Sequence, residues 1–281
     1  MGVGYAKPAG MKRKMSIELE QLGISGKDKI IRIASRNPVF CYEHDMIAEV
    51  VDKIVATEHR RLPVVSKKSE VAGVLTKSDL LAAFLRREDF EQDVSAIMSR
   101  ELILCEASES VKHVLGKFKI SRRGGFPVVE KKKLVGMVSE RDFVTLVCGR
   151  NTGVRVEDTM TRKPMVVQSG VSILDCLKTM VNTHYRRMPV VTQPIGGTLV
   201  GIVTASDLLK YIHESSYSFD ALDEPLDKIT VKNVYTVRPD DDISHAANIM
   251  VSRRVGGLLA TNEQNKLEGI ITERDILEQM S

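Results

Sequence analysis

The sequence HRRLPVV at residues 59–65 returns almost unchanged as YRRMPVV at residues 185–191. In both places two adjacent arginines stand directly before an apolar residue, a proline and two valines. A short apolar run with β-branched residues is typical of a strand. We interpret the valines as a buried strand and the arginines as charged groups at its start, positioned to bind a phosphate.

A second pattern follows this strand and occurs in four places along the chain. A glycine is followed three residues later by threonine or serine, and three residues after that by aspartate. The copies are GVLTKSD (73–79), GMVSERD (136–142), GIVTASD (201–207) and GIITERD (269–275), and their aspartates lie 63, 65 and 68 residues apart. The spacing from Ala34, Met98, Met160 and Thr230 to Pro63, Pro127, Pro189 and Leu259 is 29 residues in every copy. Such a constant period indicates a protein built from four repeats.

Each copy shows the same succession of local patterns. A short apolar run suited to a strand comes first, and a segment with apolar residues at helical spacing follows, such as Ile47, Val50, Val51 and Ile54. Two short strands joined by a polar turn come next, and a second helical segment begins after the threonine or serine. The pattern predicts an α+β fold of four β-α-β-β-α units, each of about 60 residues. A unit of this size buries its sheet poorly alone, so we expect the units to pair.

The copies alternate in one feature. The first and third carry Arg-Arg before the second strand, whereas the second and fourth carry Gly-Gly at residues 124–125 and 256–257. This alternation predicts two modules of two copies each, joined by a hinge at GRNTG (149–153). We expect the repeats to span residues 29–90, 91–150, 154–216 and 217–281. Residues 1–28 match no repeat and are predicted to form a flexible basic tail.

Composition excludes several classes of protein. Of the 281 residues, 43% are apolar and 28% charged, which is a globular balance. The net charge of +4 is too small to imply a nucleic-acid-binding protein by itself. No apolar run approaches the ~18 residues of a membrane helix and no signal peptide is evident, so we expect a cytoplasmic protein. No metal-ligand spacing or nucleophile–base pattern recurs, so we expect neither a required metal nor catalysis.

The four units resemble the CBS domain, named after cystathionine β-synthase, from about residue 30 to the C-terminus. The arrangement of four copies is similar to the γ subunit of AMP-activated protein kinase and its stand-alone archaeal counterparts. This resemblance implies that paired domains form two Bateman modules, which assemble into a flat disk. It also implies that AMP, ADP or ATP binds in clefts between paired domains.

The resemblance further implies roles for particular residues. Ribose is expected to bind the aspartates and the hydroxyls that precede them: Thr76, Asp79, Ser139, Asp142, Thr204, Asp207, Thr272 and Asp275. Phosphate is expected to bind Arg60, Arg61, Arg186, Arg187, Arg141 and Arg274. Adenine is expected to pack near Val39, Ile103, Met165 and Tyr235. The Gly-Gly copies depart from the family pattern, as does Leu259-Ala260 in place of Pro-Val, so the clefts should not all bind phosphate alike.

A structural role for the Thr/Ser-x-x-Asp motif stands beside the ligand-binding one. A threonine followed three residues later by an acidic residue also caps the start of a helix. Glutamate serves that purpose better because its longer side chain reaches back to the N-cap N–H, so four aspartates in four copies favour a second task. Capping and ribose binding are compatible.

The favoured function is a non-catalytic sensor of adenine nucleotides, with any regulated partner protein left unidentified and a homodimer of disks left open. One rival ligand class is S-adenosylmethionine or methylthioadenosine, which share adenine and ribose but lack phosphates. A second rival is a nucleic-acid-associated regulator that uses the basic tail. No helix-turn-helix or zinc-finger pattern supports that second rival.

Overall fold

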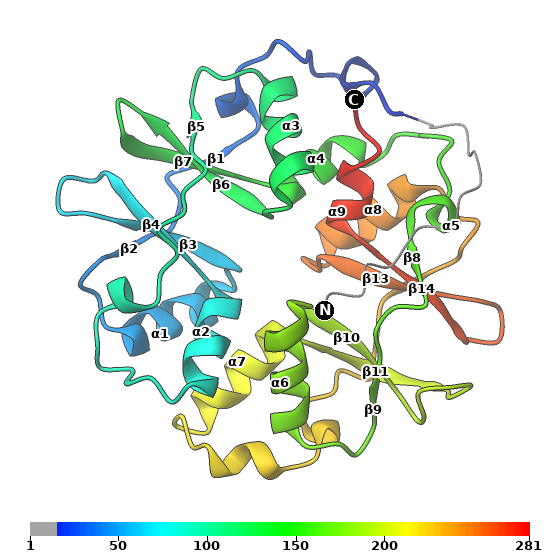
Figure 1. Ribbon diagram of the computed structural model, residues 1–281. Coiled ribbons are helices and arrows are strands. Elements are labelled where there is room, and N and C mark those ends of the chain that lie inside the picture. Colours follow the sequence, from blue (N-terminus) through cyan, green and yellow to red (C-terminus); the bar gives the residue numbers. More distant parts are fainter. Residues whose placement is uncertain (1–15) are drawn as a thin grey trace.

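The computed structural model describes residues 16–281, and its four repeats surround a common centre (Figure 1). The predicted β-α-β-β-α order is confirmed in every repeat. Repeat 1 contains β2 (Cys41–Tyr42), α1 (Ile47–Thr57), β3 (Arg61–Val65), β4 (Val71–Thr76) and α2 (Lys77–Leu85). Repeat 2 contains β5 (Cys105–Glu106), α3 (Val111–Ser121), β6 (Gly125–Glu130), β7 (Lys133–Ser139) and α4 (Glu140–Val147).

The second half of the chain repeats this order. Repeat 3 contains β9 (Val167–Gln168), α6 (Ile173–Thr183), β10 (Arg187–Val191), β11 (Leu199–Thr204) and α7 (Ala205–Glu214). Repeat 4 contains β12 (Thr236–Val237), α8 (Ile243–Ser252), β13 (Gly257–Thr261), β14 (Leu267–Thr272) and α9 (Glu273–Leu277). Two further strands, β1 (Ser35–Arg36) and β8 (Thr161–Arg162), and a short helix, α5 (Val156–Thr159), lie between them.

The register of each hairpin places the predicted site residues opposite one another. In repeat 1, β3 and β4 are antiparallel, and Arg61 lies across from Thr76. The corresponding pairs are Gly125 with Ser139, Arg187 with Thr204 and Gly257 with Thr272. The start of one strand and the start of the following helix therefore meet at the same end of every sheet.

Neighbouring repeats are joined through the segment that precedes each first strand. This segment crosses to the sheet of the partner repeat: β1 pairs with β7 of repeat 2, and β8 pairs with β14 of repeat 4. In the other direction, Ser99 bridges to Val74 of repeat 1 and Val231 bridges to Ile202 of repeat 3. Repeats 1 and 2 therefore form one module and repeats 3 and 4 the other, as predicted.

The two modules share their hydrophobic cores. One buried cluster combines residues of repeats 1 and 3, including Ile54 and Leu81 with Leu177 and Leu208. The other cluster combines residues of repeats 2 and 4. Because each core draws on both modules, the modules cannot separate without exposing buried apolar surface to water.

The connection between the modules is not the hinge that GRNTG predicts. The Asp242 carboxylate accepts hydrogen bonds from the backbone N–H groups of Thr152 and Gly153 at 3.0 and 2.8 Å. Arg150 donates to the carbonyl oxygens of Gln21 and Leu22, both at 3.3 Å. These bonds fix the connection against repeat 4 and the N-terminal segment.

The prediction of a flexible tail over residues 1–28 is wrong for residues 16–28. Ile17 pairs with Met280 near the C-terminus, and a 3-10 helix follows at Leu19–Leu22. Ile17, Leu19, Leu22 and Ile24 are buried in the core of repeats 2 and 4. The physical reason is that their apolar side chains fill a surface that only the assembled disk provides. Residues 1–15 of the predicted tail lie outside the described residues.

None of the helices over residues 16–281 is both long and apolar enough to cross a membrane.

Candidate functional site

A cavity of about 750 Å³ lies where the four repeats meet. It brings together ten of the predicted site residues: Thr76, Asp79, Thr204, Asp207, Arg60, Arg61, Arg186, Arg187, Ile103 and Tyr235. The other eight do not line it: Ser139, Asp142, Thr272, Asp275, Arg141, Arg274, Val39 and Met165. For the predicted ribose and phosphate residues, those of repeats 1 and 3 face this cavity and those of repeats 2 and 4 do not, whereas the predicted adenine contacts in the cavity come from repeats 2 and 4.

The Thr/Ser-x-x-Asp motif caps a helix in all four repeats. Thr76 donates to Asp79 Oδ2 from its hydroxyl at 2.7 Å and from its backbone N–H at 2.8 Å. The same two bonds are present at Thr204–Asp207, Ser139–Asp142 and Thr272–Asp275. Within residues 16–281, no hydrogen bond engages Oδ1 of Asp79 or of Asp207. Capping therefore leaves one oxygen of each of these carboxylates available to accept from a ligand hydroxyl.

Two of the capping aspartates, Asp79 and Asp142, are poorly hydrated. Burial raises the pKa of Asp79 from its ordinary value of 3.8, even though its bonds with Thr76 act in the opposite direction. Burial likewise raises the pKa of Asp142. A desolvated carboxylate gains more from an added hydrogen-bond donor than an exposed one does, because water no longer competes for it.

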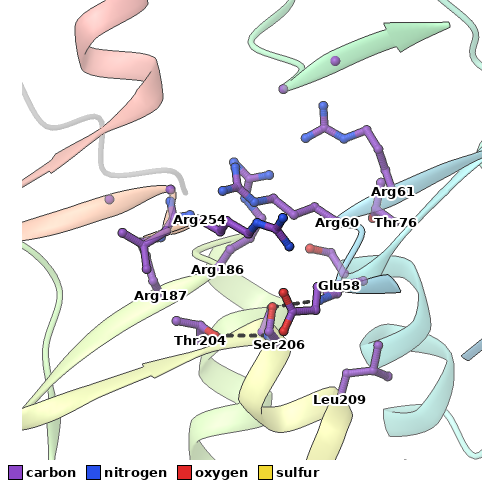
Figure 2. Close-up of a pocket in the computed structure, with 18 of the residues that line it drawn as sticks. Glu58, Arg60, Arg61, Thr76, Arg186, Arg187, Thr204, Ser206, Leu209 and Arg254 are labelled. Carbon is purple, nitrogen blue, oxygen red and sulfur yellow. Dashed lines mark hydrogen bonds between the residues drawn. The ribbon is translucent and has the colours of Figure 1, made fainter. Parts of the chain in front are cut away.

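The four arginines of repeats 1 and 3 converge on the cavity (Figure 2). Alternation along a strand predicts that only one arginine of each pair faces the cleft. The structure differs because Arg60 and Arg186 precede β3 and β10, so the alternation does not reach them. Both members of each pair therefore contribute to one cluster of positive charge.

This cluster is only partly neutralised. Burial, together with the charge of Arg186, lowers the pKa of Arg61 to about 10 and that of Arg187 to about 10. Arg61 Nη1 is buried and has no hydrogen-bond partner among residues 16–281. No ion pair engages Arg61, Arg186 or Arg187 in the same part of the chain. A buried cation without a partner is costly, so the site favours an anion of matching geometry.

The glycine pairs of repeats 2 and 4 make room for these arginines. A β-carbon on Gly124 or Gly125 would overlap the guanidinium of Arg61. A β-carbon on Gly256 would lie 2.5 Å from Arg60 Nη2 and 2.6 Å from Arg187 Nη2. The Gly-Gly copies, which sequence analysis treated only as a departure from the family pattern, therefore accept the side chains of the Arg-Arg copies.

Two buried glutamates, which sequence analysis did not select, hold further arginines. Glu273, with a side chain 3% exposed, pairs with Arg60 and with Arg141 Nε at 2.8 Å. The guanidinium groups of Arg60 and Arg141 lower the pKa of Glu273, although its burial alone would raise that pKa. Glu140 pairs with Arg274 Nε at 2.6 Å.

These pairs change the expected roles of Arg141 and Arg274. Arg141 also donates to the carbonyl of Val255 at 2.9 Å. Arg274 donates to the carbonyls of Phe118 and Arg123 at 2.5 and 2.9 Å. Both side chains thus join repeats 2 and 4 at their helix starts, outside the cavity, and we leave them out of the proposed phosphate site.

Lys77 is a further cation of the cavity that the motif analysis passed over. It is the first residue of α2, its side chain is nearly buried, and its Nζ donates to Ser206 Oγ of repeat 3 at 2.9 Å. Burial and the neighbouring Arg60 lower its pKa. The sequence did contain a signal for Lys77: the residue after the motif threonine or serine is a lysine only in repeat 1.

The cavity has two ends, which we call the first and second clefts. The first cleft lies between the Thr76–Asp79 motif and Ile103, which follows the segment bridged to β4. The second lies between the Thr204–Asp207 motif and Tyr235, which follows the segment bridged to β11. Each candidate adenine contact in the cavity therefore stands across from the aspartate of its partner repeat.

The described residues contain no group of three or more His, Cys, Asp or Glu that could hold a metal ion.

Comparison with known proteins gives consistent results. A model of the CBS domain matches residues 30–86, 94–149, 156–214 and 226–281. The chain is 27% identical over 277 residues to protein MJ1225 of Methanocaldococcus jannaschii, covering 89% of this chain and 98% of that protein. The crystal structure of MJ1225, proposed to be an archaeal homologue of γ-AMPK, is similar with a TM-score of 0.81 at 26% identity, covering 89% of this chain and 99% of the other.

CBS domain pairs of other proteins bind adenosine-containing ligands. The pair from MJ0100 was crystallised with 5′-methylthioadenosine and S-adenosyl-L-methionine; it is 25% identical, with 42% of this chain and 94% of the other covered and a TM-score of 0.39. CBSX2 was crystallised with AMP; it is 25% identical, with 45% and 95% covered and a TM-score of 0.40. The CBS domain model matches four consecutive segments that together cover most of the chain. The chain therefore belongs to the CBS domain family and carries four CBS domains.

Proposed function

We propose that the protein is a non-catalytic sensor that binds adenine nucleotides, AMP, ADP or ATP, in the first and second clefts. The observation that carries the proposal is the meeting of two free aspartate oxygens and an incompletely neutralised arginine cluster in one cavity. A carboxylate oxygen accepts from the ribose hydroxyls, and guanidinium groups bind phosphate bidentately. Val39, Met165, Asp142 and Asp275 belong to the two remaining domain junctions, which we do not assign a ligand.

Sensing follows from linkage. A nucleotide in the first cleft contacts repeats 1 and 2, and its phosphates extend toward the centre, where side chains of all four repeats meet. A ligand shifts an arrangement of domains by its difference in affinity for the two arrangements. Each added phosphate adds negative charge beside the central arginines. The strength of the interaction at the centre therefore depends on the number of phosphates.

The competing ligands, S-adenosylmethionine and methylthioadenosine, fit these two clefts less well. Neither carries a phosphate, so both would leave the arginine cluster, including the unpartnered Nη1 of Arg61, without a phosphate to bind. A thermal-shift panel separates the two classes, because a ligand that binds only the folded state raises the melting temperature. Stabilisation by methylthioadenosine but not by AMP would favour the competing class.

The roles of ribose and phosphate groups are tested with two substitutions. Asp207→Ala removes the acceptor for ribose and should weaken adenosine and AMP alike in the second cleft, by about tenfold or more. Arg186→Ala removes an exposed phosphate contact and should weaken AMP about tenfold while changing adenosine less than twofold. Isothermal calorimetry measures both, with Arg155→Ala, an exposed arginine outside the cavity, as the control. Equal losses for adenosine and AMP in both variants would overturn this division of roles.

The glycine pairs give a second test. Gly124→Ala should displace the Arg61 guanidinium, because the three atoms nearest to the new methyl carbon all belong to that group, with Nη2 at 2.4 Å. We expect AMP binding to weaken about tenfold, because one charge-assisted hydrogen bond to the phosphate is lost. Adenosine has no phosphate, so its binding should be unchanged. Gly116→Ala in α3 is the matched control, since nothing lies within 4 Å of its added methyl group. If Gly124→Ala binds AMP with wild-type affinity, the glycine pair does not position Arg61 for phosphate.

A further inference from the structure

The two clefts of the cavity occupy equivalent places in their modules but differ in side-chain charge. At the constant repeat spacing, Glu101 corresponds to Asn233, Ile103 to Tyr235 and Ser121 to Arg253. Arg122 corresponds to Arg254 in the same register. The first three differences make the second cleft more basic or more aromatic than the first, whereas Arg123 of the first cleft corresponds to Val255.

In the first cleft, the local positive charge is neutralised within the protein. Arg123 donates to the Glu101 carboxylate at 3.2 Å and to the Glu101 carbonyl at 2.6 Å. Glu58 and Lys77 of repeat 1 also line the cavity, so two cations and two carboxylates give a local charge of zero beside Asp79. The base position is taken by Ile103, an aliphatic side chain.

In the second cleft, the local positive charge is not neutralised. Arg253 and Arg254 both line it, and neither forms an ion pair within residues 16–281, so the local charge beside Asp207 is +2. Figure 2 shows Arg254 directed to the same space as Arg60 and Arg186. Arg253 lies over the ring of Tyr235, with its guanidinium carbon 5.2 Å from the ring centroid. Tyr235 remains 44% exposed, so part of its ring is open to a base.

These differences bear on the charge of the ligand. Two unopposed cations attract each added phosphate, and at 6–8 Å even in water their combined effect on a ligand with two more charges is about tenfold or more. An aromatic ring adds a stacking surface for a purine base. In the first cleft, Arg123 is already paired with Glu101, so an added phosphate does not increase the affinity there in the same way.

We infer that the two clefts select adenine nucleotides by charge: the second cleft takes the di- and triphosphates, and the first takes the monophosphate. The inference rests on the proposed function, since it divides the nucleotides between the two proposed clefts. One chain then responds to the ratio of highly and weakly phosphorylated ligands, because each class occupies its own end of a shared cavity.

The test uses variants of the full chain that each retain one cleft. Asp79→Ala leaves the second cleft, and Asp207→Ala leaves the first. Calorimetric titration with adenosine, AMP, ADP and ATP should show ATP binding Asp79→Ala about tenfold tighter than AMP. The Asp207→Ala protein should bind AMP at least as tightly as ATP. The same order of affinities in both variants would overturn the inference while leaving the proposed function intact, whereas a wild-type chain that binds none of the four ligands would overturn both.

A second set of variants avoids any loss of helix capping. Arg253→Gln and Arg254→Gln change exposed side chains, so the fold is retained. Together, in the otherwise unchanged chain, they should weaken ATP binding about tenfold and leave AMP binding within twofold. Arg122→Gln is the matched control, because Arg122 is the exposed counterpart of Arg254 and does not line the cavity. An equal loss of AMP and ATP in the double variant, or an equal loss of ATP in the control, would contradict charge selection.

Discussion

Replacing Leu22 by aspartate is expected to lower the free energy of unfolding by about 4 kcal/mol. Leu22 is 3% exposed and belongs to the core that repeats 2 and 4 share. The substitution removes an apolar side chain from that core and places a carboxylate among apolar side chains. The effect is large because the N-terminal segment covers the junction of both modules.

Denaturant unfolding followed by circular dichroism measures this loss. Gln21→Asp is the control, because Gln21 is exposed in the same 3-10 helix and its replacement should change stability by no more than about 0.5 kcal/mol. If Leu22→Asp unfolds at the wild-type midpoint, residues 16–28 do not stabilise the disk.

Replacing Glu273 by glutamine is expected to cost about 3 kcal/mol of stability at neutral pH. The substitution removes the one carboxylate that Arg60 and Arg141 share, and breaking a buried pair leaves its cations uncompensated. Mutual repulsion among the central arginines adds to that cost. Glu263→Gln, at an exposed position in the turn between β13 and β14, is the matched control.

The effect of Glu273→Gln should depend on pH with a defined sign. The pKa of Glu273 in the folded chain is lower than its ordinary value of 4.5, because Arg60 and Arg141 outweigh the opposing effect of burial. The carboxylate therefore contributes stability above pH 4.5 and loses that contribution as the pH falls through its folded-state pKa. Unfolding curves between pH 7 and pH 3 should show the gap between wild type and variant closing below pH 4.5. A gap that stays constant over this range would exclude an ionised Glu273 as its cause.

The repeat architecture was predictable because its signals are local. The helical spacing of residues such as Ile47 and Val51 and the strand pattern of RLPVV each lie within one repeat. The helix cap is local as well, because Thr76 and Asp79 are only three residues apart. Four copies of each signal made the order of elements and the pairing into modules readable from the chain.

The rest depends on contacts between distant residues. Apolar residues such as Leu19 and Ile24 indicate burial only once the surface of repeats 2 and 4 exists. Arg141 and Arg274 directly precede the motif aspartates in the sequence, as the family pattern implies. Their side chains instead form ion pairs with Glu273 and Glu140 and do not line the cavity. Glu273 lies 213 residues from Arg60. A pattern within one repeat therefore cannot predict this ion pair.

The selection of two clefts out of four was also beyond the sequence. All four repeats carry the aspartate, so the motif alone does not distinguish the four sites, and the Gly-Gly copies predict only that the clefts do not all bind phosphate alike. The structure distinguishes them because the arginines of repeats 1 and 3 lie over the glycines of repeats 2 and 4. The alternation of Arg-Arg and Gly-Gly contained this information, but only the packed modules show which side chain fills which space.

The most direct test of the central claim is a crystal structure of the full chain grown with saturating AMP. We expect AMP in the first and second clefts, with ribose hydroxyls within hydrogen-bond distance of Asp79 and Asp207 and phosphate on the arginines of repeats 1 and 3. AMP located elsewhere on the disk, or both clefts empty at saturation, would show that these clefts are not the nucleotide sites.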